Sequence, residues 1–143
     1  MGSSKRMRTL IKVKTHQEKK AQIELMEIRR QKQDEEKALR TLEETRESAM
    51  QDAASKQRVS AADAQANSAY LQSISRQITQ QEKKVDDIGH KEGHKREELV
   101  AKTQSKKMVE KLDQKRRAEV SKALDLKEQK MMDVFAQRKR KGA

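Results

Sequence analysis

The chain has 143 residues and a formal net charge of +12, with no Cys, Pro or Trp, one Tyr and one Phe. Charged residues make up 41% of the sequence and hydrophobic residues 32%, which excludes a thick globular core and leaves disorder or long helices. The absence of Pro and the low Gly count favour helices, because almost nothing interrupts the backbone hydrogen-bond ladder. The composition therefore predicts one elongated all-α domain over residues 1–143.

Several classes of site and segment are excluded at the same level. A chain without Cys has no disulfide and no thiolate metal site, which fits a reducing cytoplasm. The basic amino terminus lacks the apolar run of a signal peptide, and no stretch approaches the roughly 20 apolar residues that span a bilayer. We expect a soluble protein with no transmembrane segment.

The positive charge is concentrated at the two ends of the sequence. Residues 1–20 carry a net charge of +6, residues 127–143 carry +4, and the long middle, residues 21–126, carries +2. The termini are therefore predicted to bind an anionic partner. The alternatives are an acidic protein surface, nucleic acid and membrane headgroups.

A first helix is predicted from about residue 5 to residue 55. Apolar residues recur there at intervals of four and three, which keeps one stripe facing a partner helix, as a coiled coil requires. The members of this seam are Met7, Ile11, Ala21, Leu25, Ile28, Leu39, Leu42, Ala49 and Ala53. Polar residues interrupt the seam at Lys14, Glu18, Lys32, Glu35 and Arg46. These interruptions predict a marginally stable seam.

The rhythm stops at residues 55–59, and a turn is predicted at about residues 56–60. Ser60 is followed by Asp63 three positions later, which is a variant of the capping box that begins a helix. A short turn at this point lets the chain reverse as an α-hairpin. The alternative is that both halves continue as one straight helix.

A second helix is predicted from residue 61 to about residue 138, followed by a basic tail at residues 139–143. The heptad spacing continues through Ile74, Ile78, Gln81, Val85, Ile88 and Leu99. Gly89 and Gly93 fall inside this helix, where each costs about 1 kcal/mol relative to Ala, so a bend or a loose segment is expected there.

The two helices differ in length, and this difference predicts an unpaired segment. Helices of about 50 and 78 residues are roughly 75 and 117 Å long. Folding at the turn places Met7 beside Met108 or Val109. The second helix is then left without a partner helix from about Leu112 onward. The fold expected is an antiparallel two-helix coiled coil whose longer second helix overhangs at its C-terminal end. Because the overhang carries exposed apolar residues, it is predicted to bind another molecule.

Catalytic and metal chemistry find little support. The chain has no glycine-rich phosphate loop and no nucleophile in a recognisable turn, so we expect no enzyme and no cofactor. His90 and His94 are four residues apart, a spacing that zinc ligands use, with Glu97 three residues further on. The neighbouring Lys91 and Lys95 oppose a cation, and a solvated face is the preferred interpretation.

Nucleic-acid and membrane binding are weaker predictions than protein binding. The basic ends allow non-specific phosphate contacts, but only Tyr70 and Phe135 are available for stacking, so no specific nucleic-acid partner is expected. Membrane binding by the terminal helix is a weaker prediction, because this helix has no Trp and few bulky side chains that could anchor it in lipid. A second apolar cluster surrounds Tyr70, where Tyr70, Ile74, Gln77 and Gln81 share one helical stripe; it serves either as seam or as a surface for a partner.

The C-terminal end resembles the carboxy-terminal signature of the flagellar export protein FliJ family. The residues that carry this resemblance are Leu124-Asp125, Gln129-Lys130, Met132-Asp133, Phe135-Ala136-Gln137-Arg138 and Lys139-Arg140-Lys141. The first helix is similar as well, at positions that include Leu10, Leu25, Arg29-Arg30 and Leu42. In the second helix, Tyr70-Leu71-Gln72-Ser73-Ile74 and Ile78-Thr79-Gln80 follow the family's aromatic-led stretch.

This resemblance implies a stalk in a type III export apparatus. Such a stalk is an antiparallel coiled coil similar to the γ stalk of rotary ATPases, and it sits in the centre of the hexameric export ATPase, FliI. It promotes assembly and activity of that ring, contacts the export gate protein FlhA and is implicated in handling export chaperones. The implied location is cytoplasmic, peripherally associated with the inner-membrane export apparatus.

The resemblance also implies two sets of contact residues. The expected ring contacts are Met131, Met132, Phe135, Gln137, Arg138, Lys139, Arg140 and Lys141, helped by Lys5, Arg6 and Arg8. The expected gate contacts are Leu42, Tyr70, Ile74, Gln77 and Gln81. Ala38, Thr45 and Ala49 depart from the family, which can carry Gln and two Tyr there. These departures leave a flagellar member or a YscO-like injectisome stalk as alternatives, beside a basic coiled-coil scaffold that binds nucleic acid non-specifically.

Overall fold

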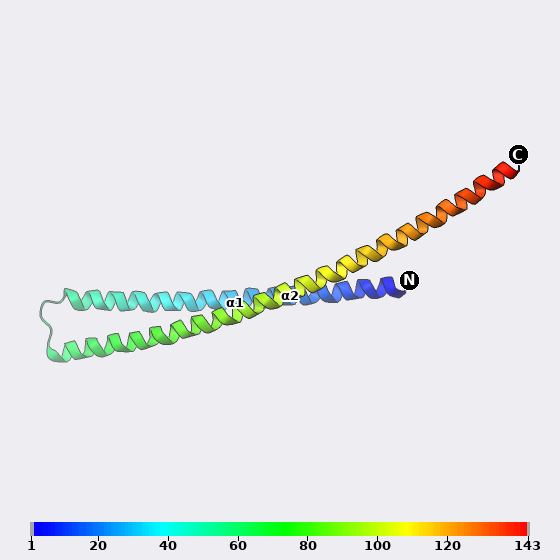
Figure 1. Ribbon diagram of the computed structural model, residues 1–143. Coiled ribbons are helices and arrows are strands. Elements are labelled where there is room, and N and C mark those ends of the chain that lie inside the picture. Colours follow the sequence, from blue (N-terminus) through cyan, green and yellow to red (C-terminus); the bar gives the residue numbers. More distant parts are fainter. Residues whose placement is uncertain (1, 143) are drawn as a thin grey trace. The chain divides into compact units, whose positions relative to one another are not determined.

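Two helices make up nearly all of the chain: α1, Gly2–Ser55, and α2, Ala61–Lys141 (Figure 1). The computed structural model describes the backbone of residues 2–142 and the side chains of residues 4–142, and it contains no strand within that range. The two helices pack antiparallel, so the predicted all-α helical hairpin is confirmed. Lys139, Arg140 and Lys141 belong to the last turn of α2, whereas Ala143, the end of the expected tail, lies outside the described residues.

The chain reverses between Ser55 and Ala61, and side chains cap both helix ends. The Ser55 hydroxyl donates a hydrogen bond to the Asp52 carbonyl oxygen at 2.9 Å. On the other side of the turn, the Asp63 amide donates to Ser60 Oγ at 3.1 Å, as an N-cap requires. The Ala64 amide donates to the Ser60 carbonyl oxygen at 2.9 Å and begins the helical ladder. Ser60 is therefore the N-cap residue that the sequence predicted.

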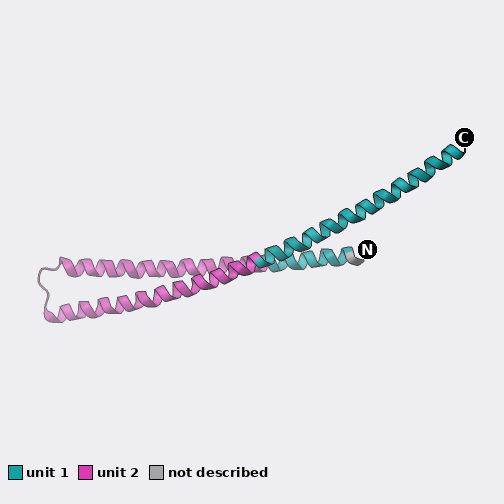
Figure 2. Cartoon of the chain, viewed as in Figure 1, with its two compact units in different colours: residues 1–19, 101–143 teal, residues 20–100 magenta. Residues whose placement is uncertain are grey.

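Contacts within the chain divide it into two units (Figure 2). Unit 2 consists of residues 20–100 and contains the turn, and its core is a narrow seam between α1 and α2. The buried apolar residues of this seam are Ala21, Leu25, Ile74 and Ile78. Leu39, Leu42, Val85 and Ile88 are half-buried around them. The heptad positions expected to face inward in unit 2 are thus all buried or half-buried.

Polar residues also occupy the seam of unit 2, and they are paired across it. Gln81 is only 8% exposed, and its Nε2 donates a hydrogen bond to the Glu35 carbonyl oxygen at 2.9 Å and another to the Glu35 carboxylate. Burying an amide without such hydrogen-bond partners would lower the stability of the folded chain by about 1–3 kcal/mol. Glu35, one of the polar interruptions predicted from the sequence, is therefore accommodated in the seam by bonds to Gln81 of the other helix.

Ion pairs join α1 to α2 further along unit 2. The Glu92 carboxylate accepts hydrogen bonds from Lys32 Nζ at 3.0 Å and Arg29 Nε at 3.3 Å. These hydrogen bonds, that from Lys32 first, lower the pKa of Glu92. Lys95 Nζ bonds to Glu24 at 3.0 Å, which lowers the pKa of Glu24 and raises that of Lys95. Because each pair joins specific positions, these contacts favour one register over its neighbours.

α2 runs without interruption through Gly89 and Gly93. Neither residue has a positive φ, and a Cβ built at either position meets no atom within 4 Å. No turn or close approach requires glycine at these two positions.

Unit 1 consists of residues 1–19 and residues 101–143; residues 2–19 belong to α1, and residues 101–141 belong to α2. Its seam is more polar than that of unit 2. Val109 is the buried apolar residue of the described chain in this unit, and Asp113 is buried four positions later. Glu18 bonds to Lys106 Nζ at 3.3 Å. The pKa of Glu18 is lowered, mainly by a hydrogen bond from Thr103 and then by Lys106.

The end of the paired region lies further along α2 than expected. Of the two residues expected beside Met7, Val109 is buried, whereas Met108 is 66% exposed. Asp113 is buried and Arg116 is half-buried, so α2 is uncovered from residue 117 and not from residue 112. One reason is that α1 begins at Gly2, three residues before the predicted start, and so covers nearly one more turn of α2.

Candidate functional site

The candidate site is a stripe on α2 that continues the seam beyond the part covered by α1. Seam positions of α2 recur at intervals of three and four, and the covered ones end with Val109, Asp113 and Arg116. The same intervals continue through Val120, Leu124, Lys127, Met131, Val134 and Arg138. We call these six residues, with Lys130 and Phe135 beside them, the terminal stripe. It lies on a helix that has no second helix beside it in this part of unit 1 (Figure 1).

The last three turns of the terminal stripe form a shallow concavity with a defined composition. Its apolar floor is Met131, Val134 and Phe135, and Phe135 is 67% exposed. Three cations border this floor, namely Lys127, Lys130 and Arg138. An apolar floor bordered by cations fits a partner surface that offers an apolar knob surrounded by carboxylates.

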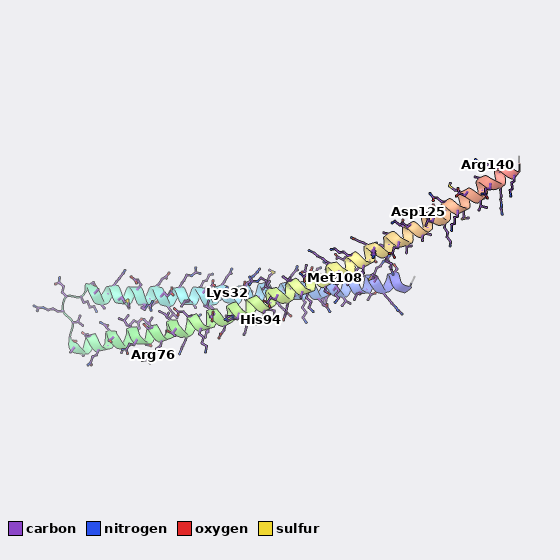
Figure 3. All side chains as sticks on the ribbon, in the orientation of Figure 1. Lys32, Arg76, His94, Met108, Asp125 and Arg140 are labelled. Carbon is purple, nitrogen blue, oxygen red and sulfur yellow. The ribbon has the colours of Figure 1, made fainter. Side chains whose placement is uncertain are left out.

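The terminal stripe is exposed along its whole length. Every residue from 117 to 142 is exposed, and Figure 3 shows side chains projecting on all sides of the helix around Asp125 and Arg140. The uncovered helix from residue 117 to Lys141 measures about 37 Å at 1.5 Å per residue. That length is sufficient to pass well into another protein.

The structure brings together only part of the residues expected to contact the ring. Met131, Phe135 and Arg138 lie on the concave face. Met132 directly follows Met131 and is therefore turned by about 100° around the helix, and Gln137 lies on the opposite flank. Lys139, Arg140 and Lys141 wind around the final turn, whereas Lys5, Arg6 and Arg8 are exposed on α1.

Three residues of the concavity were not among the expected contacts: Lys127, Lys130 and Val134. The heptad rhythm could have found Lys127 and Val134, whereas Lys130 lies beside the seam and is not selected by it. When the heptad rhythm is extended past the paired region, it selects one face of the helix, Lys127, Met131, Val134 and Arg138. The FliJ-like signature instead selects a run of consecutive residues, which face all directions.

The residues expected to contact the gate separate into buried and exposed ones. Ile74 and Gln81 are 4% and 8% exposed because they belong to the seam of unit 2, and Leu42 is half-buried. Tyr70 is 52% exposed and Gln77 is also exposed. Tyr70 borders a shallow groove with residues of α1 that include Thr45 and Ala49. Within this set, Tyr70 and Gln77 are the residues that a partner can reach.

His90 and His94, the pair with zinc-ligand spacing in the sequence, both lie on the exposed surface of α2. His90 Nε2 lies 3.5 Å from Asp86 Oδ2 on the exposed surface of α2. Among the described residues, no three His, Cys, Asp or Glu side chains are placed so that they could hold a metal ion. The search for membrane-spanning helices likewise finds no helix in the described chain that is both long and apolar enough.

Fold and site together define the class of protein. It is a coiled-coil hairpin that leaves the basic C-terminal end of α2 uncovered. The profile of the FliJ family, described as flagellar FliJ protein, matches residues 3–142. The chain belongs to this family and is a component of flagellar type III protein export. No curated protein and no solved structure matches the chain.

Proposed function

We propose that the chain is the central stalk of the export ATPase ring and that the terminal stripe is its ring-binding surface. The stalk binds the hexameric, FliI-like ATPase, favours its assembled state and stimulates ATP hydrolysis by the ring. The chain itself catalyses no reaction. A stalk can shift the ring toward one state only by binding that state more tightly than the others, which requires side-chain contacts with its subunits.

The observation that carries this function is the uncovered continuation of the seam from residue 117 to Lys141. Up to Arg116 the same stripe is covered by α1, and beyond it Val120, Met131 and Phe135 are left exposed. Exposed apolar residues grouped on one element indicate a binding partner. Because cations surround the concavity, the surface of the ring that faces it should be acidic.

A stalk in the middle of a ring is surrounded on all sides, and this agrees with the distribution of the remaining expected contacts. Met131 and Phe135 face one direction, and they meet one subunit of the ring. The residues that face other directions meet other subunits; they are Met132, Gln137 and Lys139 to Lys141. Lys5, Arg6 and Arg8 add exposed cations from α1.

The export gate and the chaperones are the other partners in this function. A FlhA-like gate protein contacts unit 2 through Tyr70 and Gln77, with the half-buried Leu42 beside them and Ile74 and Gln81 supporting the surface from within the seam. The chain works in the cytoplasm, where it associates peripherally with the inner-membrane export apparatus and meets export chaperones.

The function is tested by phosphate release from the purified export ATPase with and without the chain. We expect stimulation by the unaltered chain, and its loss with the double variant Met131→Ala, Phe135→Ala. The matched control is Ile23→Ala, Met26→Ala, because these two α1 residues of unit 2 are 65% and 69% exposed, close to the 63% and 67% of the tested pair. An unaltered chain that fails to stimulate the ATPase and instead retains DNA in a salt-sensitive manner would assign it to the scaffold class.

A further inference from the structure

Folding concentrates the positive charge of the chain in the paired part of unit 1, residues 1–19 and 101–117. These segments hold thirteen Lys or Arg and three Asp or Glu, a net charge of +10. Residues 20–100 carry −1 and residues 118–143 carry +3. The two basic segments are far apart in the sequence but belong to one compact unit, coloured teal in Figure 2.

Five of the thirteen cations of this part lie on one side of the helix pair. In an antiparallel coiled coil, residues that directly follow the seam residues of both helices fall on the same side of the pair. In unit 1 the cations at such positions are Arg8, Lys12, Lys19, Lys107 and Arg117. We call these five residues the basic side. All five are exposed.

The opposite side of the same helix pair has a different composition. Residues that directly precede the seam residues fall there, and they include Leu10, Val13, Met108 and Leu112. All four are exposed apolar residues. We call them the apolar side. Two exposed cations, Arg6 and Lys115, also lie on this side, so the exposed apolar residues of the paired part of unit 1 lie on the side with fewer cations.

Most of the charge on the basic side is not neutralised within the chain. Among the described side chains, Arg8, Lys12, Lys19 and Lys107 form no ion pair, although the charge of Lys107 helps to lower the pKa of Glu18, after Thr103 and Lys106. Arg117 Nε bonds to Asp113 at 3.2 Å. Glu110 is the acid that lies on this side, and it is 3.9 Å from Lys106. A surface with this excess of free cations needs an anionic counterpart.

We propose that the basic side binds the surface of an anionic lipid bilayer. The basic side has no aromatic residue on which a nucleic-acid base could stack and no apolar residue to fill a pocket on a protein. Three of its four free cations are Lys, a hydrated point charge that suits diffuse attraction, whereas Arg suits bidentate recognition of carboxylates. From Arg8 to Lys19 the cations extend about 16 Å along one side of α1, so they can approach a flat charged surface together.

Lipid binding of this kind is weak and reversible, and it goes beyond the stalk function. It uses a surface other than the terminal stripe, so the two interactions can be measured separately. A polybasic surface without an inserted anchor holds a protein at a membrane only marginally. A second contact with the export apparatus raises the effective affinity without any new lipid contact, because the chain is already held near the membrane.

The test is flotation of the full-length chain with vesicles of phosphatidylcholine alone and of phosphatidylcholine with phosphatidylglycerol at 2:1. We expect binding to the anionic vesicles only, with a steep loss as salt increases. The test variant is Lys12→Gln, Lys19→Gln, Lys107→Gln, which keeps good helix formers and touches no proposed ring contact. Since one cation near an anionic surface contributes roughly fivefold to binding, this triple change lowers binding about 100-fold.

The matched control removes the same charge from unit 2, with Lys37→Gln, Lys83→Gln, Lys91→Gln, at exposed positions without an ion pair among the described residues. This control keeps most of the binding if the basic side is the contact. Equal binding to neutral vesicles, or equal losses in both triple variants, would overturn the assignment. Loss of binding in Met108→Gln, Leu112→Gln with the Lys triple unaffected would assign the contact to the apolar side. Loss of DNA retention, but not of vesicle binding, in the Lys triple would assign the surface to nucleic acid.

Discussion

Truncation of a seam residue and truncation of a stripe residue are expected to affect different properties of the chain. Ile78 is 3% exposed in the seam of unit 2, whereas Phe135 is 67% exposed on the terminal stripe. Ile78→Ala should lower the free energy of unfolding and leave the ring-binding surface unchanged. Phe135→Ala should leave the free energy of unfolding nearly unchanged and weaken ATPase stimulation.

The expected magnitudes follow from burial. Ile78→Ala removes three buried carbon groups at about 0.8 kcal/mol each, or about 2.4 kcal/mol. Buried Ile to Ala changes span about 2–5 kcal/mol, and the low end applies because a seam between two helices is open at both edges and refills easily. Phe135 already meets solvent in the folded chain, so its truncation costs about 0.5 kcal/mol or less.

Urea unfolding followed by circular dichroism at 222 nm measures both variants, and phosphate release from the export ATPase measures their function. The unfolding comparison is made at equal denaturant slope, because a change in slope would indicate that the two units unfold separately. A loss of 2 kcal/mol or more for Phe135→Ala would show that this residue is covered in solution. The assignment of α2 beyond residue 117 as uncovered would then be wrong.

Three further changes follow from particular contacts. Replacing both Gly89 and Gly93 by Ala should raise the free energy of unfolding by about 2 kcal/mol, read from urea midpoints, because each Ala has open space and favours helix; a decrease would reveal a packing role for glycine. Asp113→Leu should stabilise unit 1 by about 1 kcal/mol, read as protection of amides near residue 109 from hydrogen exchange, because Asp113 Oδ1 is buried without a hydrogen bond among the described residues, and the cost of burying the carboxylate should exceed the gain from its ion pairs with Arg116 at 3.9 Å and Arg117 at 3.2 Å; lower protection would show that these ion pairs contribute more than the burial costs. The lowered pKa values of Glu24 and Glu92 predict that the stability contributed by their ion pairs is fully present above pH about 4.5 and is lost as pH falls through the pKa values of the folded chain. A thermal midpoint that stays constant from pH 6 to pH 3 would contradict this.

The sequence by itself determined the helices and the stripe along which they pair. Heptad spacing is a local property, and each apolar residue at intervals of three and four adds to the same face whatever the rest of the chain does. Leu25, Ile74 and Ile78 were assigned to the seam on this basis, and they are buried. The turn could be predicted for the same reason, because Ser60 caps a helix through atoms only three residues away.

Only the tertiary structure decided where α2 leaves α1 and which surfaces result. A heptad repeat looks alike after every seven residues, so the sequence does not distinguish one register from the next, and contacts across the pair do. The bonds of Gln81 with Glu35 and of Glu18 with Lys106 belong to one register, and this register moves the first uncovered residue from 112 to 117. The same pairing brings residues 2–19 beside residues 101–117, and the basic side arises because two moderately basic segments then act as one surface.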